Sequence, residues 1–276
     1  MLSSLDEDYV RINILPMIVR SIAQADERPM PDQRYRRPPI TEAVIEVRFA
    51  EAVEDRELRN VSHAFASHYP GEQILLNVEF GLSVGDLVRS PTAQMKAGQQ
   101  SYRRSTLSEA ELALAAPASL IISQLPDYPG WQAFFDRFKR DWSLWKREVG
   151  YRKIVRVGVR YINRLDIPAD GPVVAHERYL NLSARSPDDL GPTTTYAIQA
   201  TFQSAQVNGS IVINSGVVPS PLEGRLSIML DIDVSRENSL PQKDEDLLLL
   251  LQDFREEKNR VFEACITDRA RELFDI

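Results

Sequence analysis

Residues 154–168 read IVRVGVRYINRLDIP and alternate between apolar and charged side chains. Successive side chains of a β-strand point to opposite faces of the sheet, so this pattern predicts one long strand with two different faces. The apolar face carries Val155, Val157, Val159, Tyr161, Leu165 and Ile167. The other face carries Arg156, Arg160, Arg164 and Asp166. Such a strand is typical of the middle of an antiparallel sheet that helices cover on one face only.

Two further stretches show the same division into an apolar and a polar face. In residues 38–50, Ala43, Ile45, Val47 and Phe49 alternate with Val44, Glu46 and Arg48. In residues 224–235, Leu226, Ile228, Leu230, Ile232 and Val234 alternate with Ser227, Met229, Asp231 and Asp233. Further strands are predicted at residues 74–80, 100–106, 111–124 (broken near Pro117), 196–203 and 209–215, with a tight turn at Asn208 and Gly209. Within residues 196–203 the polar side holds Gln199, Thr201 and Gln203.

Apolar residues at helical spacing predict three helices. The first covers residues 55–69, and the second begins after Pro129 and Gly130 with an aromatic stripe: Trp131, Phe134, Phe135, Phe138, Trp142 and Trp145. We interpret this stripe as core, because aromatic side chains dominate core burial. The third helix is predicted to run without a break over residues 244–274, with Cys265 on its buried stripe. There Leu248, Leu249 and Leu250 widen the stripe, which predicts cover on two sides.

The order strand, helix, strands, helix occurs twice along the chain. We therefore predict a single α+β domain over residues 38–276, made of the halves 38–149 and 150–276 and preceded by an N-terminal extension, residues 1–37. Its fold class is a mostly antiparallel sheet with the long helices on one face. The duplication is inferred from element order, because sequence identity between the halves is low.

Four motifs carry a resemblance to a known family. Residues 38–49 (PPITEAVIEVRF), 128–131 (YPGW), 157–164 (VGVRYINR) and 230–233 (LDID) resemble, in the same order, a sporadically distributed bacterial protein family of unknown function. The match covers about residues 38–274. The resemblance implies a bacterial or phage source and a compact α+β domain, and it implies no established activity. The element order also resembles the TATA-binding-protein-like and helix-grip plans, an analogy that carries no function.

Composition limits the class of protein. The 276 residues, 43% hydrophobic and 26% charged, are ordinary for a soluble globular protein, and no apolar run approaches the roughly 20 residues that cross a bilayer. The net charge of −7 argues against general nucleic-acid binding, which needs a basic surface. The single cysteine, Cys265, excludes an internal disulfide. We expect a cytoplasmic protein without a membrane segment.

Two candidate catalytic patterns do not withstand inspection. Residues 81–85 (GLSVG) match the G-x-S-x-G nucleophile elbow, with Asp166 or Asp170 and then His176 in the hydrolase order. That elbow requires a strand followed by a helix in a parallel sheet, whereas Pro91 follows closely here and the strands read as antiparallel. His63 and His68 are five residues apart on a helix and cannot share a ligand face. We expect no catalytic residues, no metal site and no cofactor.

The polar face of the sheet is the candidate site. Its predicted residues are Glu46, Arg48, Arg156, Arg160, Asn163, Arg164, Asp231 and Asp233. Asp231 and Asp233 lie about 7 Å apart on one strand face, close enough to hold a cation. Because nearby arginines nearly balance these carboxylates, a cross-strand ladder of ion pairs is the simpler interpretation.

Two functions stay open from the sequence. The favoured one is a non-catalytic binding or regulatory protein that uses this face on a protein partner or as a homodimer. The alternative is a small-molecule or nucleic-acid processing module. In that case Arg160 and Arg164 would bind phosphate or carboxylate, and Asp231 and Asp233 would bind a divalent ion.

Overall fold

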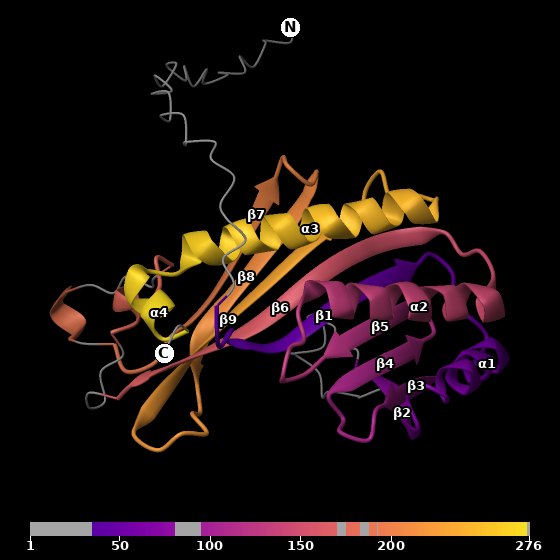
Figure 1. Ribbon diagram of the computed structural model, residues 1–276, viewed down its shortest axis with the longest axis horizontal. Helices are drawn as coiled ribbons and strands as arrows, with labels where there is room; N and C mark the ends of the chain where they lie inside the picture. Colours follow the sequence, from indigo (N-terminus) through magenta and orange to yellow (C-terminus); the bar gives the residue numbers. More distant parts are fainter. Residues whose placement is uncertain (1–34, 81–94, 170–174, 183–187, 192, 275–276) are drawn as a thin grey trace, which may run out of the picture. The chain divides into compact units, whose positions relative to one another are not determined.

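The computed structural model describes residues 35–80, 95–169, 175–182, 188–191 and 193–274 (Figure 1). The chain divides into two units, Met1–Gln33 and Arg34–Ile276, and every described residue belongs to the second unit. The G-x-S-x-G motif at residues 81–85 and Asp170 lie outside the described residues.

The strands of the described residues form one antiparallel sheet, as predicted. Nine strands follow one another in the order β2-β3-β4-β5-β1-β6-β9-β8-β7. Their bounds are β1 Ile40–Phe49, β2 Gly71–Phe80, β3 Met95–Ser105, β4 Glu111–Ala116, β5 Ser119–Gln124, β6 Ile154–Pro168, β7 Ala197–Ser204, β8 Gly209–Val218 and β9 Arg225–Arg236. The break predicted near Pro117 is the turn between β4 and β5. The two central strands, β1 and β6, pair with each other although two helices and four strands of the described chain lie between them in the sequence.

The register of the central strands decides which side chains share a face. Val159 on β6 lies opposite Ile45 on β1 and Val234 on β9, and all three side chains are fully buried. The next residue, Arg160, lies opposite Val44 and Asp233. The charged side chains therefore lie on the face opposite the buried apolar core, which confirms the alternation predicted for residues 154–168.

The helices pack on the apolar face. Their bounds are α1 Asp55–Phe65, α2 Trp131–Val149, α3 Asp244–Cys265 and α4 Asp268–Glu272, with short 3₁₀ turns η2 His176–Arg178 and η3 Asp188–Leu190. Figure 1 shows α2 and α3 running across the sheet. Phe49 of β1 stacks on Trp145 of α2 with ring centroids 5.1 Å apart, and Lys258 of α3 lies 3.8 Å from the centroid of the Tyr161 ring on β6. Helix α1 packs against β3 and β4.

The aromatic stripe of α2 is core, as predicted. Phe134, Phe138 and Trp145 are fully buried, and the remaining rings of the stripe stack on one another or on the sheet. Large rings on one side of a long helix bury much apolar area against the sheet. This burial fixes the position of α2 over β5 and β1.

The last helix is broken, so the single helix predicted for residues 244–274 is wrong. Helix α3 ends at Cys265, where Ile266 turns to an extended conformation and forms a bridge with Leu180. Thr267 then caps α4, since its hydroxyl accepts the backbone N–H of Ala270 at 3.4 Å. Two β-branched residues in succession disfavour the helix, and a threonine N-cap starts a new one.

Two further observations concern the cover of α3 and the start of the packed domain. Of the three leucines expected to widen the stripe of α3, Leu250 is buried and Leu248 packs against the core, but Leu249 is exposed. At the other end, Tyr35 lies edge-on to Phe274 with ring centroids 5.1 Å apart, and the Arg37 N–H donates to the Phe274 carbonyl at 2.9 Å. Tyr35 and Arg37, which precede the first strand, therefore pack against the C-terminal end of the domain.

The turn between β7 and β8 follows its predicted chemistry. Asn208 adopts a left-handed φ of 46°, which asparagine tolerates better than most residues. At the next position a Cβ on Gly209 would lie 2.2 Å from the Ser235 carbonyl oxygen of β9. Only glycine allows the backbones of β8 and β9 to approach this closely.

Candidate binding face

Most of the predicted site residues share the sheet face opposite the helices. We define the charged face by Glu46, Arg48, Arg156, Arg160, Arg164, Asp166, Asp231 and Asp233, which come from β1, β6 and β9. The central position of these strands places the charges in the middle of the sheet rather than at its edge.

Asn163 does not belong to the charged face, so its assignment there was wrong. It has the same strand parity as Val159 and Tyr161, is buried on the helix side, and donates through Nδ2 to the Leu230 carbonyl at 3.0 Å. A buried amide is tolerated when it is hydrogen-bonded, and Asn163 satisfies backbone oxygen within the core. The odd number of Asn163 in the alternation already indicated the apolar face. It was assigned to the charged face because its side chain is polar.

Arg156 joins the three central strands. Its guanidinium contacts Glu46 on β1 and donates through Nη2 to Asp233 Oδ2 on β9 at 2.6 Å. Arg48 contacts the same Glu46, with Nε 2.8 Å from Oε1. The Arg156 side chain is only 12% exposed. Arg156 therefore holds strands together and offers little surface to a ligand.

Gly158 makes room for this arrangement. It follows Arg156 on the same face, and a Cβ at this position would lie 2.8 Å from Arg156 Nη1. A glycine inside a strand often marks a close approach of another group, and here that group is a guanidinium lying flat on the sheet.

Arg160 is held in a different way, and it remains accessible. Its Nε and Nη2 donate to the two carboxylate oxygens of Asp231, each at 2.8 Å, and Asn214 Nδ2 donates to Asp231 Oδ2 at 2.9 Å. The Asp231 side chain is 1% exposed, whereas that of Arg160 is 47% exposed. A bidentate pair fixes the plane of the guanidinium. The arrangement thus presents a rigid cationic plane at the surface on a buried carboxylate support.

A third pair extends the charged face along β6. Arg164 Nε lies 3.0 Å from Asp166 Oδ1, and Asp166 also accepts a hydrogen bond from the Ser227 hydroxyl of β9. Arg164 is 36% exposed. The three sets of contacts form the ladder of ion pairs that was the simpler interpretation of these charges.

The charges on the face cancel. Arg48, Arg156, Arg160 and Arg164 give four positive charges, and Glu46, Asp166, Asp231 and Asp233 give four negative ones. Glu42, close enough to Arg160 to raise the pKa of its guanidinium, adds one negative charge. A face without excess positive charge gives phosphate groups no long-range attraction.

Burial and pairing shift two pKa values here. Burial raises the pKa of the Asp233 carboxyl above its ordinary value, although Arg156 and Arg160 act in the opposite direction. The hydrogen bonds to Asp231 raise the pKa of Arg160 and keep its charge fixed. Both carboxylates of the Asp231–Asp233 pair already accept guanidinium hydrogen bonds, so a cation bound there would have to displace an arginine. Among the described residues no group of three or more metal-ligating side chains comes together.

Apolar side chains lie among these charges. Val44, Ile162 and Met229 have the parity of the charged face and are half-buried. They surround Arg160 and Arg164 in the register, since Val44 lies opposite Arg160 and Met229 opposite Arg164. Arginine beside aliphatic surface is the composition of the centre of many protein interfaces.

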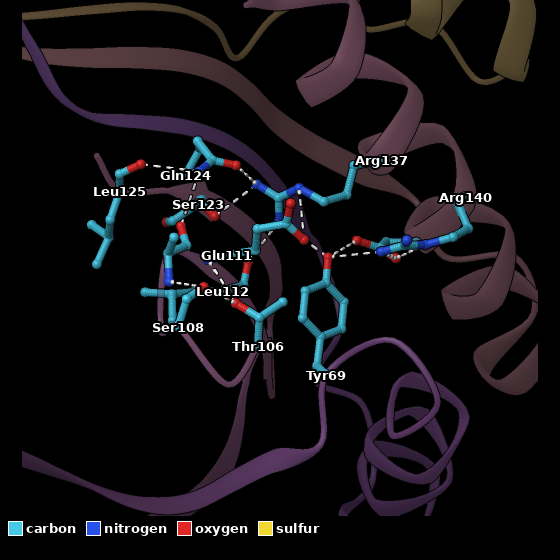
Figure 2. A network of polar contacts seen from close by, with 12 residues as sticks. Tyr69, Thr106, Ser108, Glu111, Leu112, Ser123, Gln124, Leu125, Arg137 and Arg140 are labelled. Carbon is cyan, nitrogen blue, oxygen red and sulfur yellow. Dashed lines mark hydrogen bonds and ion pairs between the residues drawn. The ribbon is translucent and has the colours of Figure 1, made fainter. Parts of the chain in front are cut away.

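A second arginine–carboxylate cluster, under helix α2, was missed in the sequence. In this buried network (Figure 2), Tyr69 donates its hydroxyl to Asp141 Oδ2 at 2.5 Å and accepts from Arg137 Nη1 at 3.1 Å and Arg140 Nη2 at 2.9 Å. Arg137 also donates to the Ser123 carbonyl at 2.8 Å.

The centre of the buried network is closed to solvent, whereas the Arg140 side chain is 35% exposed. Tyr69 and Asp141 are fully buried and Arg137 nearly so. Burial raises the pKa of Asp141, against the lowering effect of the Tyr69 hydroxyl and of Arg140. The sequence did contain a signal for this network: Arg137 and Asp141 are charged residues four positions apart inside the aromatic stripe of α2. Their saturated hydrogen bonding indicates a structural role, tying α2 to the ends of β4 and β5.

Other sequence candidates are placed but not assembled into a site. His176 is buried and lies 4.2 Å from the ring centroid of Tyr196, remote from His63 and His68 in the element order. Cys265 is buried as predicted, and burial raises the pKa of its thiol to about 11, which disfavours the reactive thiolate.

No protein-family model matches the chain, and no curated protein matches it in sequence. The described helices include none with the length and apolar character needed to span a membrane.

Proposed function

We propose that this is a non-catalytic binding protein whose charged face captures a protein partner. The observation that carries the proposal is Arg160, half-exposed yet held flat by the buried Asp231. A guanidinium fixed before binding loses little side-chain entropy when a partner covers it. Arginine is among the residues that contribute most to protein interfaces when placed near their centre.

The surroundings of Arg160 support a protein rather than a nucleic acid as the partner. The net charge of the face is close to zero, and aliphatic side chains lie between the ion pairs. A protein surface of mixed polarity complements such a face, whereas a phosphate backbone requires excess positive charge. Helices α1, α2 and α3 all pack on the other side of the sheet, so they leave this face available.

The test is affinity capture from bacterial extract with three versions of the chain. Arg160→Lys keeps the charge but cannot form the bidentate pair, and we expect it to lose the proteins that the wild type captures. Arg147→Ala is the matched control, because Arg147 is an exposed arginine of α2 on the helix side. Identical captured proteins for all three versions would contradict the proposal.

The alternative is a processing module with a phosphate or divalent-ion site on the same face. A thermal-shift screen with nucleotides, Mg²⁺ and Mn²⁺ distinguishes it from a protein-binding function. A specific ligand stabilises the native state by mass action. A rise in Tm that Asp231→Asn abolishes would favour the alternative. No rise is expected for a protein that binds another protein.

We also infer that the two halves of the domain share one plan by duplication, similar to the TATA-binding-protein-like and helix-grip plans. Each half begins with a central strand, β1 or β6, and ends with a long helix, α2 or α3. In each half the last strand, β5 or β9, pairs with the first one. This matching order supports the inference, and the pairing of β1 with β6 would join the two copies.

A further inference from the structure

The edge strand β7 (Ala197–Ser204) is the feature from which a further property follows. It is the last strand of the sheet, and in the described part of the chain only β8 pairs with it. An unpaired edge presents a row of backbone N–H and C=O groups that another strand can complete.

The hydrogen bonds of β8 show which groups of β7 face outward. The Val217 N–H donates to the Tyr196 carbonyl at 3.2 Å, and Tyr196 and Val217 continue the register that pairs Ala197 with Gly216. Because hydrogen-bonded pairs alternate along an antiparallel ladder, the even residues of β7 bond to β8. The odd residues, Thr201 at their centre, therefore turn their N–H and C=O groups away from the sheet.

The two edges of the sheet differ in their protection against pairing. The opposite edge strand, β2, carries a charged side chain at Glu72 and has a register shift between Leu76 and Val78. Charges and bulges of this kind prevent association between edges. The sequence of β7, AIQATFQS, contains no charge and no proline, and its register with β8 is uninterrupted. Phe202 on β7 is 46% exposed.

We propose that β7 pairs antiparallel with β7 of a second copy of this chain, about a two-fold axis at Thr201. This register sets Thr201 opposite Thr201, Gln199 opposite Gln203, and Ala200 opposite Phe202. Each large ring then lies beside a small side chain, each amide beside an amide, and no like charges meet. The outward hydrogen-bonding groups of Thr201 fall in a hydrogen-bonded pair, as the backbone geometry requires.

The consequence of this pairing is one sheet through both copies. Side chains that lie opposite each other in a ladder share a face, so the helices of both copies lie on one side and both charged faces on the other. This dimer does not depend on the proposed partner. If the partner exists, the dimer presents two capture surfaces side by side.

Disulfide trapping tests the register directly. In the proposed pair, two Thr201 Cα atoms lie about 5.5 Å apart, within the range that a disulfide bridges. Two Gln199 residues lie roughly 14 Å apart, beyond that range. We expect Thr201→Cys to form a covalent dimer under mild oxidation and Gln199→Cys to remain monomeric on a non-reducing gel. The absence of the Thr201→Cys product, or equal cross-linking of both variants, would overturn the proposal.

Sedimentation of the full chain from about 1 µM to about 100 µM tests the non-covalent dimer. Thr201→Pro removes an outward N–H and no bond to β8, so we expect a folded monomer, while Thr201→Val should remain a dimer. Thr201→Lys leaves the backbone intact and places like charges opposite each other, so it should also be monomeric if the proline variant does not fold. A monomeric wild type, or dimeric proline and lysine variants, would overturn the proposal.

Discussion

The two arginine–carboxylate clusters of this protein lie on opposite sides of one sheet and differ in their access to water. In the buried network, Arg137 and Asp141 are enclosed between α2 and the strands and use their hydrogen bonds on neighbouring groups. On the charged face, Asp231 is buried but Arg160 is half-exposed. The same residue types thus fix a helix on one side and present a rigid cation on the other.

The difference in burial predicts the size of each stability effect. Removing one partner of a buried ion pair leaves an uncompensated group in the core, whereas a surface arginine contributes little. The variants below compare the two clusters, from the largest expected effect to the smallest.

Arg137→Ala should cause the largest loss. It leaves the Tyr69 hydroxyl, the Ser123 carbonyl and the Gln124 amide oxygen without this donor inside the core. We expect a loss of about 3–5 kcal/mol in the free energy of unfolding, measured by urea denaturation. Arg147→Ala on the same helix, 63% exposed, is the control and should change stability by no more than about 0.5 kcal/mol. Similar values for both variants would remove the distinction between network and surface.

Arg160→Ala should cost less, about 1–3 kcal/mol, because the buried Asp231 keeps its hydrogen bond from Asn214. Urea denaturation of Arg160→Ala, Asp231→Asn and the double variant forms a thermodynamic cycle. We expect the double variant to lose less stability than the sum of the two single ones. Additive losses would show that the bidentate pair does not couple the two residues.

The pH dependence of stability should reveal Asp141. Its pKa in the folded protein is raised above the ordinary 3.8, chiefly by burial, so the native state holds this proton more tightly than the unfolded chain. Stability from this group is therefore greatest below the unfolded pKa and falls as pH rises through the native value, by at most about 1.4 kcal/mol per pH unit. In urea titrations over this range, the stability of wild type relative to Asp141→Asn should decrease with pH. A relative stability that increases with pH would contradict the raised pKa.

Arg48→Ala should have the smallest effect on stability. Arg48 is 54% exposed and contacts Glu46 through Oε1, while Arg156 continues to hold Oε2 of the same carboxylate. We expect a change within about 0.5 kcal/mol in urea denaturation. Partner capture by this variant should nonetheless weaken, since Arg48 borders the charged face. Full capture would restrict the binding surface to Arg160 and Arg164.

The faces of the sheet were predictable, but the contacts within them were not. Alternation in residues 154–168 is a local property, and it assigned Val159 and Arg160 to opposite faces correctly. The contact between Arg156 and Glu46 depends on β1 and β6 being neighbours, which no local pattern specifies. The role of Gly158 likewise follows only once the guanidinium of Arg156 is placed above it.

The buried network was hidden for a related reason. Arg137 and Asp141 sit within an aromatic stripe, and their partner Tyr69 follows α1, on a separate part of the chain. A charged residue on a core stripe indicates buried pairing, but the partner emerges only from the packing of α1 against α2. The break after Cys265 was missed because a helical stripe of apolar residues continues past it, and only the extended Ile266 ends the helix.

The pairing of β1 with β6 has a consequence for synthesis of the chain on the ribosome. The other neighbour of β1, β5, is complete at residue 124, whereas β6 begins only at residue 154. The ribosome therefore synthesises five strands of the sheet before the sixth. Until β6 is made, one side of β1 has no neighbouring strand. We expect nascent chains stalled before residue 154 to be sensitive to protease along β1, and chains released after β6 to be resistant.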